Sequence, residues 1–494
     1  MSPILILMLI ASYFIVLIAI SYFTSKEDSN AAFFKANKSA PWYLVAFGMI
    51  GASLSGVTFI SVPGAVEAKQ FGYFQAVLGY FFGYLVIAFV LLPIYYKLNL
   101  TSIYTFLKSR FGLVSYKTGA VAFLISRTIG AAFRLFLVAN VLQFIVFENL
   151  GIPFYLTVVI TILLIWLYTF RGGIKTIIFT DTLQTLFMLI SVIVMLFFLM
   201  SALDLNSSLD LFNFVQNSDL SQTFFFDNTK DPQFFWKSFL SGMFITITMT
   251  GLDQDMMQKN LTCKSLKDAQ KNMISFSVVL ILVNILFLVL GLLLTHYARE
   301  NGIEAQKDDL YPAIAMLPKM NVAISSFFLL GLIAAAYSSA DSALTSLTTS
   351  FCIDIIDIET KSETDKKRIR KKTHILFSVI LVIVILLFKV LFKDVSVIWE
   401  LFTAAGYTYG PLLGLFAFGI FTKIKVKDQY VWLVGVLAPV ISYILKTYSA
   451  QLFNGNQIGW EILIINGILT FIGLLLISRR SSIINKNLGN NHTI

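Results

Sequence analysis

The sequence GMIGASLSG, residues 48–56, interrupts a long apolar stretch with glycines and serines. A second apolar stretch, in the other half of the chain, is interrupted in the same way. Its small and hydroxylated residues are Gly242, Thr246, Thr248, Thr250 and Gly251. Glycine in one membrane helix often means only close helix packing. A matched pair of interrupted helices in two halves of a chain is the best sequence indicator of the central site of a membrane transporter.

The composition places the chain in a membrane. Apolar residues make up 57% of it, charged residues only 13%, and the mean hydropathy is +0.81. Soluble chains carry about 25% charged residues, whereas each crossing of a bilayer needs about 20 consecutive apolar residues. The pattern predicts an all-α membrane protein with about thirteen transmembrane helices. Basic residues lie beside the apolar stretches, so the net charge of +10 indicates membrane topology rather than nucleic-acid binding.

The predicted helices form a single polytopic domain over residues 1–480. Its parts are an extra N-terminal helix (3–23), a first repeat (42–201), a second repeat (236–421), two C-terminal helices (429–478) and a cytoplasmic tail (481–494). Each repeat holds five spans, an odd number, so the second repeat enters the membrane from the opposite side and the repeats are inverted.

Positive charge predicts the orientation of these spans. Most of the 37 Lys and Arg residues fall on one side, among them Lys26, the run Lys366–Lys372 and the segment Lys259–Lys271. Because cytoplasmic loops are enriched in Lys and Arg, we expect the N-terminus outside, the C-terminus in the cytoplasm, and a multi-pass protein of the plasma (inner) membrane.

Two aspartates lie within predicted spans, where an ionisable group is costly and indicates a functional site. Asp181 begins one span and Asp341 lies midway along another. Helical spacing places Ser338, Asp341 and Ser342 on one face. Hydroxyls, carboxylates and freed backbone carbonyls are the hard oxygen ligands that a sodium ion needs. These residues therefore predict a cation site beside the interrupted stretch 48–56.

Two arginines also lie within a predicted span. Arg127 and Arg134 are seven residues apart and share one helix face. Either guanidinium could receive the carboxylate of a solute, because its geometry suits that group. Alternatively, one of them pairs with Asp181 or Asp341 as a structural or gating link. The sequence leaves both interpretations open.

Three function classes compete at this point. The first is secondary active transport of a small organic solute coupled to sodium, with Na+ as the coupling ion and no obligate protein partner. The second is proton-coupled symport through Asp181 and Asp341. The third is a membrane receptor that senses a solute without transporting it. An enzyme is not expected, because no nucleophile and base pair is visible.

Three stretches resemble the sodium:solute symporter family, which includes sodium-coupled sugar, proline and sialic acid transporters. Residues 171–184, RGGIKTIIFTDTLQ, resemble its Gly-Gly…Thr-Asp…Gln segment. Residues 250–267, TGLDQDMMQKNLTCKSLK, resemble its Asp-Gln…Gln-Arg…Lys-Ser-Leu signature, and residues 335–342, AAYSSADS, resemble its sodium helix. The resemblance runs over residues 1–480. It implies alternating access and an inverted five-plus-five, leucine-transporter-like fold, with one extra helix before the repeats and two after.

The resemblance also implies two sodium sites. Matched by motif, the family's sodium site would use carbonyls and hydroxyls of Gly51, Leu54, Ala335, Ser338 and Ser339. A second site, present in some members, corresponds to Asp181, Ser338, Asp341 and Ser342. A serine is usual in those members where this chain has Asp341, so the departure adds a carboxylate.

The solute site implied by the resemblance lies between the interrupted spans. Its residues would be Ser55, Thr58, Phe74, Gln75, Arg127, Arg134, Thr246 and Thr403. The combination of Ser55, Thr58 and an arginine is similar to the sialic acid transporters and suggests an anionic solute. Sugars and amino acids stay open as alternatives.

Overall fold

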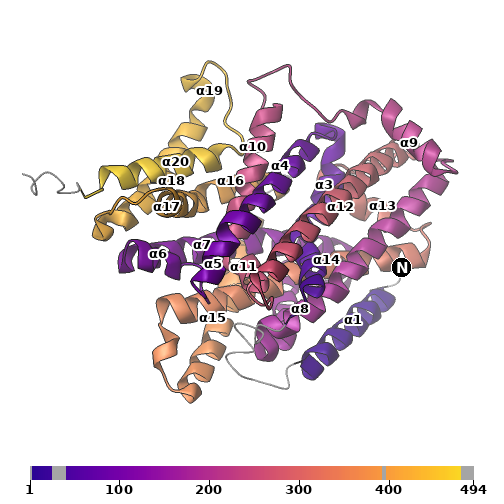
Figure 1. Ribbon diagram of the computed structural model, residues 1–494. Coiled ribbons are helices and arrows are strands. Elements are labelled where there is room, and N and C mark those ends of the chain that lie inside the picture. Colours follow the sequence, from indigo (N-terminus) through magenta and orange to yellow (C-terminus); the bar gives the residue numbers. More distant parts are fainter. Residues whose placement is uncertain (1–2, 25–39, 392–396, 480–494) are drawn as a thin grey trace, which may run out of the picture.

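The computed structural model describes residues 3–24, 40–391 and 397–479, and most of them are helical (Figure 1). Within these ranges nine helices are long and apolar enough to cross a bilayer. A tenth span is counted when two helices that meet at a 47° bend, α16 (Val397–Thr408) and α17 (Gly410–Phe421), are taken as one. The prediction of an all-helical membrane protein is confirmed. Lys26 and the predicted tail, 481–494, lie outside the described residues.

The described residues of the first half of the chain form mainly long helices. They are α1 (Pro3–Thr24), α3 (Trp42–Lys69), α4 (Tyr73–Val86), η2 (Ile87–Leu91), α5 (Leu92–Lys97), α6 (Thr105–Arg110), α7 (Leu113–Leu142), η3 (Gln143–Phe147), η4 (Glu148–Leu150) and α8 (Phe154–Ala202). The last two of the five spans predicted for the first repeat, 42–201, join into α8. They are separated there by one non-helical residue, Gly173, with φ 53° and ψ −142°.

The second half contains more short elements. They are α9 (Ser208–Asn217), η5 (Asp219–Ser221), α10 (Phe235–Thr246), η6 (Ile247–Gly251), α11 (Gln254–Asn260), α12 (Leu266–Glu300), η7 (Lys307–Asp309), α13 (Leu310–Ala315), α14 (Val322–Ser350), η8 (Phe351–Ile355), η9 (Ile358–Thr360), α15 (Glu363–Leu391), α16, α17, η10 (Asp428–Tyr430), α18 (Val431–Thr447), α19 (Ser449–Leu452) and α20 (Ile462–Leu476).

Both predicted interruptions are present. In α3 the backbone leaves the helical conformation at Ser55, with φ 43° and ψ 167°. A positive φ is unfavourable for a residue with a side chain and persists only where the surroundings hold it. The other interrupted span consists of α10, the π-helix η6 and α11, with Leu252 and Asp253 outside any helix. The backbone carbonyls next to such breaks lose their helical partners and become available to ligands.

Helix α14 lies at the centre of the bundle, where it packs against α3, α7 and α8.

Close approach of the interrupted helices to their neighbours depends on glycine. A Cβ atom on Gly242 of α10 would lie 2.1 Å from the carbonyl oxygen of Ala76 in α4. Helix α1 lies along α8 at one edge of the molecule, and α17, α18 and α20 gather at the opposite edge (Figure 1).

Candidate functional site

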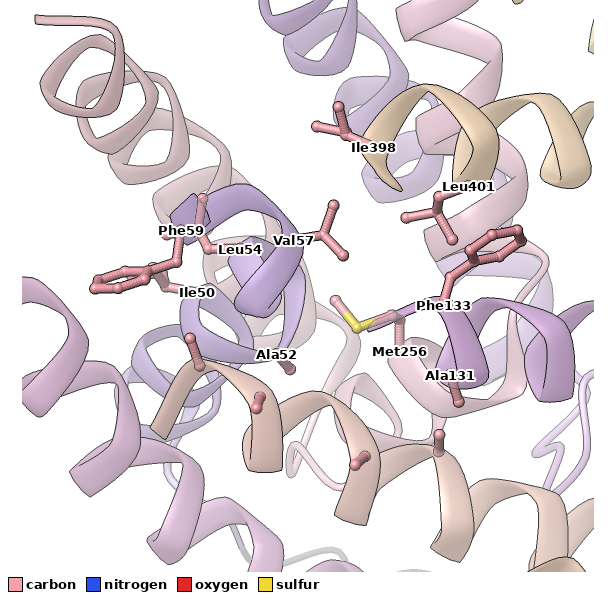
Figure 2. Close-up of a cluster of buried hydrophobic side chains, with 14 of the residues drawn as sticks. Ile50, Ala52, Leu54, Val57, Phe59, Ala131, Phe133, Met256, Ile398 and Leu401 are labelled. Carbon is pink, nitrogen blue, oxygen red and sulfur yellow. The ribbon is translucent and has the colours of Figure 1, made fainter. Parts of the chain in front are cut away.

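A cavity of about 610 Å³, counting its open side, lies between the break in α3 and helices α4, α7, α10 and α16. Part of its wall is apolar, and Figure 2 shows four of these residues: Val57 from α3, Met256 from α11, and Ile398 and Leu401 from α16. Its polar lining is rich in hydroxyl groups. These residues are Ser53, Ser55, Thr58, Tyr73, Tyr80, Tyr84, Thr246 and Thr250, together with Arg127 and Arg134.

Five of the residues implied for the solute site line this cavity. They are Ser55, Thr58, Arg127, Arg134 and Thr246. Three others, Phe74, Gln75 and Thr403, are not among the lining residues. The hydroxyl of Thr403 instead accepts a hydrogen bond from the ammonium of Lys446 (3.1 Å).

The side chain of Gln75 holds in place the loop between η5 and α10. Its Nε2 donates to the carbonyl oxygens of Gly72 (3.2 Å) and Gln233 (2.9 Å), and its Oε1 accepts from the amide of Phe225 (3.1 Å). All its hydrogen-bonding capacity is therefore directed at backbone. The tyrosines of α4 were not anticipated, because nothing in the spacing of Tyr73, Tyr80 and Tyr84 sets them apart from lipid-facing aromatic residues.

The charge of Arg127 is neutralised inside the protein. Its guanidinium forms an ion pair with Asp255 of α11, and both side chains are almost fully buried, at 3% and 1% exposed. The neighbouring Asp253 accepts a hydrogen bond from the hydroxyl of Tyr409 (2.5 Å). These contacts tie α11 to α7 and to the start of α17. The sequence had offered Asp181 or Asp341 as an internal partner for an arginine, and the partner found here is Asp255.

Arg134 is different, although it lies on the same helix two turns away. It is buried, at 8% exposed, and lines the cavity. It makes no hydrogen bond or ion pair with any other residue in the described part of the chain, and its Nε is buried without an acceptor. The cavity is therefore lined by one guanidinium that no described residue contacts through a hydrogen bond or ion pair, although the carboxyl groups of Asp253 and Asp255 interact with it electrostatically.

Oxygen atoms from α3 and α14 converge beside the break. The hydroxyl of Ser339 donates to the carbonyl oxygen of Ala52 (3.1 Å). A Cβ atom on Gly51 would lie only 3.3 Å from Oγ of Ser338, whose hydroxyl is buried without a hydrogen-bond partner. Leu54 and Ala335, the other implied ligands, are buried in the same two helices. Backbone and hydroxyl oxygens of this kind fit a desolvated sodium ion.

A second polar cluster lies further along α14. The ammonium of Lys259, in α11, is 2.6 Å from Oδ2 of Asp181, and the hydroxyl of Tyr168 donates to Oδ2 of Asp341 (2.9 Å). Several buried oxygens of this cluster have no hydrogen-bond partner among the described residues. They are Oδ1 of Asp181, Oδ1 of Asp341, and the hydroxyls of Ser338, Ser342 and Thr345.

Lys259 is the residue that sequence reasoning placed least well. Its position among the basic residues 259–271 favoured a cytoplasmic loop, but its side chain is only 2% exposed. The available signal was its place in the stretch 250–267, where the family signature has a basic residue at the same position.

Known proteins of one family resemble the chain over most of its length. A profile described as "Sodium:solute symporter family" matches residues 33–429. The chain is 25% identical to the sodium/sialic acid symporter NanT of Aliivibrio fischeri over 91% of its own length and 89% of the relative's. It is 24% identical to the sodium/sialic acid symporter SiaT of Proteus mirabilis, with 91% of each chain covered.

A mouse protein, sodium-coupled monocarboxylate transporter 1, is 24% identical over 86% of this chain and 70% of its own length. Among solved structures, the substrate-bound, outward-open state of a Na+-coupled sialic acid symporter superposes with a TM-score of 0.80. That match has 19% sequence identity and covers 96% of this chain and 99% of the other. At this level of identity the structural match establishes the fold.

Proposed function

Because the chain belongs to the sodium:solute symporter family, we propose that the solute it carries with sodium is a small organic anion and that Arg134 receives its carboxylate. Sodium is the coupling ion, and transport proceeds by alternating access. The proton-coupled and receptor alternatives are therefore set aside. What the family does not determine is the solute, and here the residues of the cavity supply the argument.

The observation that carries the proposal is the unpaired guanidinium of Arg134. A buried charge without a partner is costly, so a protein retains one where a ligand supplies the opposite charge. A planar guanidinium binds a carboxylate through two parallel hydrogen bonds. Arg127 cannot serve equally well, since Asp255 already neutralises it.

The remaining polar lining suits a solute that carries several hydroxyl groups. Ser55 and Thr58 lie at the break in α3, and Thr246 faces them from α10. Tyr73, Tyr80 and Tyr84 add phenolic hydroxyls along α4. The bacterial relatives at 24–25% identity are sialic acid symporters. A hydroxylated carboxylate such as a sialic acid is accordingly the first candidate.

The proposal includes two cation sites. The first uses Gly51, Leu54, Ala335, Ser338 and Ser339, which belong to α3 and α14, two helices that pack against each other. The second uses Asp181, Asp341 and Ser342, whose carboxylate and hydroxyl oxygens lack partners in the described part of the chain.

The proposal also keeps the predicted topology. We assign thirteen spans in the plasma (inner) membrane, with the N-terminus outside and the C-terminus in the cytoplasm. Support comes from two apolar helices of 10–17 residues, Phe154–Thr169 and Ile462–Leu476, and from the interrupted pair α10 and α11, which lie where three further spans are expected.

The test is the thermal unfolding midpoint of the protein purified in detergent. The midpoint would be measured with sialic acids, other carboxylates, sugars and amino acids, each in sodium and in choline buffer of equal ionic strength. A ligand of the native state raises the midpoint by mass action. We expect stabilisation by carboxylates in sodium only. Stabilisation by neutral sugars that does not require a carboxylate would contradict the assignment of Arg134.

A further inference from the structure

The second cation cluster contains a positive charge of the protein itself. The ammonium of Lys259 lies 2.6 Å from Oδ2 of Asp181, and the two side chains are 2% and 0% exposed. Lysine is rarely buried unless it is paired. A buried ion pair that loses one partner leaves a charge with no compensation, which costs far more than the pair contributes. Lys259 and Asp181 therefore form a fixed unit that joins α11 to α8.

The cluster around this ion pair contains one more carboxyl group than ammonium groups. Asp341 interacts electrostatically with both Asp181 and Lys259, so the cluster holds two carboxyl groups and one ammonium. When both carboxyl groups are ionised, the ammonium neutralises one and a single negative charge remains. The hydroxyl of Tyr168 binds Oδ2 of Asp341, but a neutral donor does not cancel that charge.

The unpartnered oxygens point to where a mobile cation would bind. Oδ1 of Asp341 and Oδ1 of Asp181 are both buried without a hydrogen bond, as are the hydroxyls of Ser338 and Ser342 on the helix face of Asp341. A sodium ion would bring the cluster to neutrality and occupy these acceptors together. No ammonium among the described residues binds these free oxygens, since that of Lys259 is held by Oδ2 of Asp181.

We propose that Lys259 is a permanent cation within the second site. It neutralises Asp181 and leaves Asp341 as the carboxylate that binds the transported sodium ion. By doing so it lowers the affinity of the site for sodium, so that the ion is released. The inference rests on the second cation site assigned above. Its physical basis is that the ammonium cancels the attraction that the carboxylate of Asp181 would otherwise add to that of Asp341. Such an attraction is only weakly screened where water is excluded.

The experiment measures the sodium concentration that half-saturates the rise in thermal midpoint of the full chain in detergent. Lys259→Gln removes the ammonium and keeps a polar side chain, and Lys259→Arg is the matched control that keeps the charge. We expect the half-saturating sodium concentration to fall about tenfold or more in Lys259→Gln, the change that corresponds to about 1.4 kcal/mol. Lys259→Arg should remain near the wild-type value. An unchanged sodium affinity in folded Lys259→Gln would overturn the proposal.

A double variant keeps the proposal testable if Lys259→Gln alone does not fold. In Asp181→Asn with Lys259→Gln, both members of the ion pair become neutral while Asp341 is untouched. Because the variant keeps the single net negative charge of the cluster and a side-chain oxygen at position 181, saturable binding of the second sodium ion should persist. Loss of the second sodium ion in this variant would show that Asp181, not Asp341, supplies the binding charge.

The proposed sodium coupling is tested separately by the wild-type protein. If sodium has no effect on its midpoint with any solute, the assignment of the sodium sites fails. If the wild type responds to sodium but neither Lys259 variant differs from it, only the role of Lys259 fails.

Discussion

Replacing each arginine of α7 by methionine should have opposite consequences, although the two residues lie on one helix face. Methionine keeps much of the side-chain length and removes the charge. Arg127→Met deprives Asp255 of its partner, in a contact that is almost fully buried. Arg134→Met removes a guanidinium that has no hydrogen bond or ion pair to another described residue. The first change should therefore damage the ion-free protein, and the second should damage only solute binding.

The expected losses of stability and of solute affinity follow from the burial of the two arginine side chains. Removing one partner of a buried ion pair costs about 3–5 kcal/mol of stability, because the other charge is left in a medium that solvates it poorly. Arg134 has no ion-pair contact, so its replacement should cost much less: it removes the cost of burying the charge and loses only the longer-range attraction of Asp253 and Asp255. For the solute, loss of a charged partner costs about 2–5 kcal/mol of binding, which is about 30-fold to several thousandfold in Kd.

Two thermal unfolding measurements separate these effects. In choline buffer without solute, the midpoint of Arg127→Met should fall well below that of the wild type, while that of Arg134→Met should stay level or rise. In sodium with a saturating carboxylate, Arg127→Met should still be stabilised and Arg134→Met should not. The double variant Arg127→Met with Asp255→Leu should recover most of the lost stability, since an apolar pair replaces the ionic one. Equal destabilisation by both single variants would refute the reasoning.

Three further outcomes are expected. Ser339→Ala removes a hydroxyl from the first sodium site and should abolish sodium-dependent uptake at an unchanged expression level of folded protein; an unchanged sodium affinity would exclude Ser339 as a ligand. Asp341→Ser removes the added carboxylate and should lower the Hill slope of sodium activation toward 1, whereas an unaltered slope would make Asp341 structural. Gly242→Ala places a Cβ 2.1 Å from a backbone oxygen of α4 and should cost about 1–3 kcal/mol, an overpacking cost; the control Gly130→Ala, whose nearest neighbouring atom would be 3.9 Å away, should leave the unfolding midpoint unchanged.

The architecture could be predicted because its causes are local. Apolar stretches long enough to cross a bilayer must be helices, since backbone groups have no other partners in lipid. The break at Ser55 follows from the same logic. Glycine and serine are weak helix formers, and the helix that contains this run has its one non-helical residue, with a positive φ, at Ser55. Gly173 separates the predicted spans within α8, but nothing in the sequence shows that they join almost without a loop.

The partners of buried charges could not be predicted, because they depend on which helices meet. Sequence placed Arg127 and Arg134 on one face, but only the position of α11 determines that Asp255 reaches the first and not the second. The burial and the partner of Lys259 could not be predicted for the same reason. A lysine at the end of a span normally extends into water, and only the approach of α11 to α8 reveals its buried partner.

The anionic solute and the second cation site are linked by the energetics of the membrane potential. One charge that crosses 100 mV contributes about 2.3 kcal/mol, or roughly 40- to 50-fold in concentration ratio. A monoanion that moves with one sodium ion transfers no net charge, so the potential does not drive it at all. A second sodium ion restores one net charge and with it the full contribution of the voltage. A cavity in which Arg134 selects an anion therefore gains most from an additional carboxylate such as Asp341. That carboxylate must also release its ion at the cytoplasmic side, and Lys259, 2.6 Å from Asp181, limits the affinity for the ion by neutralising the other carboxylate of the cluster.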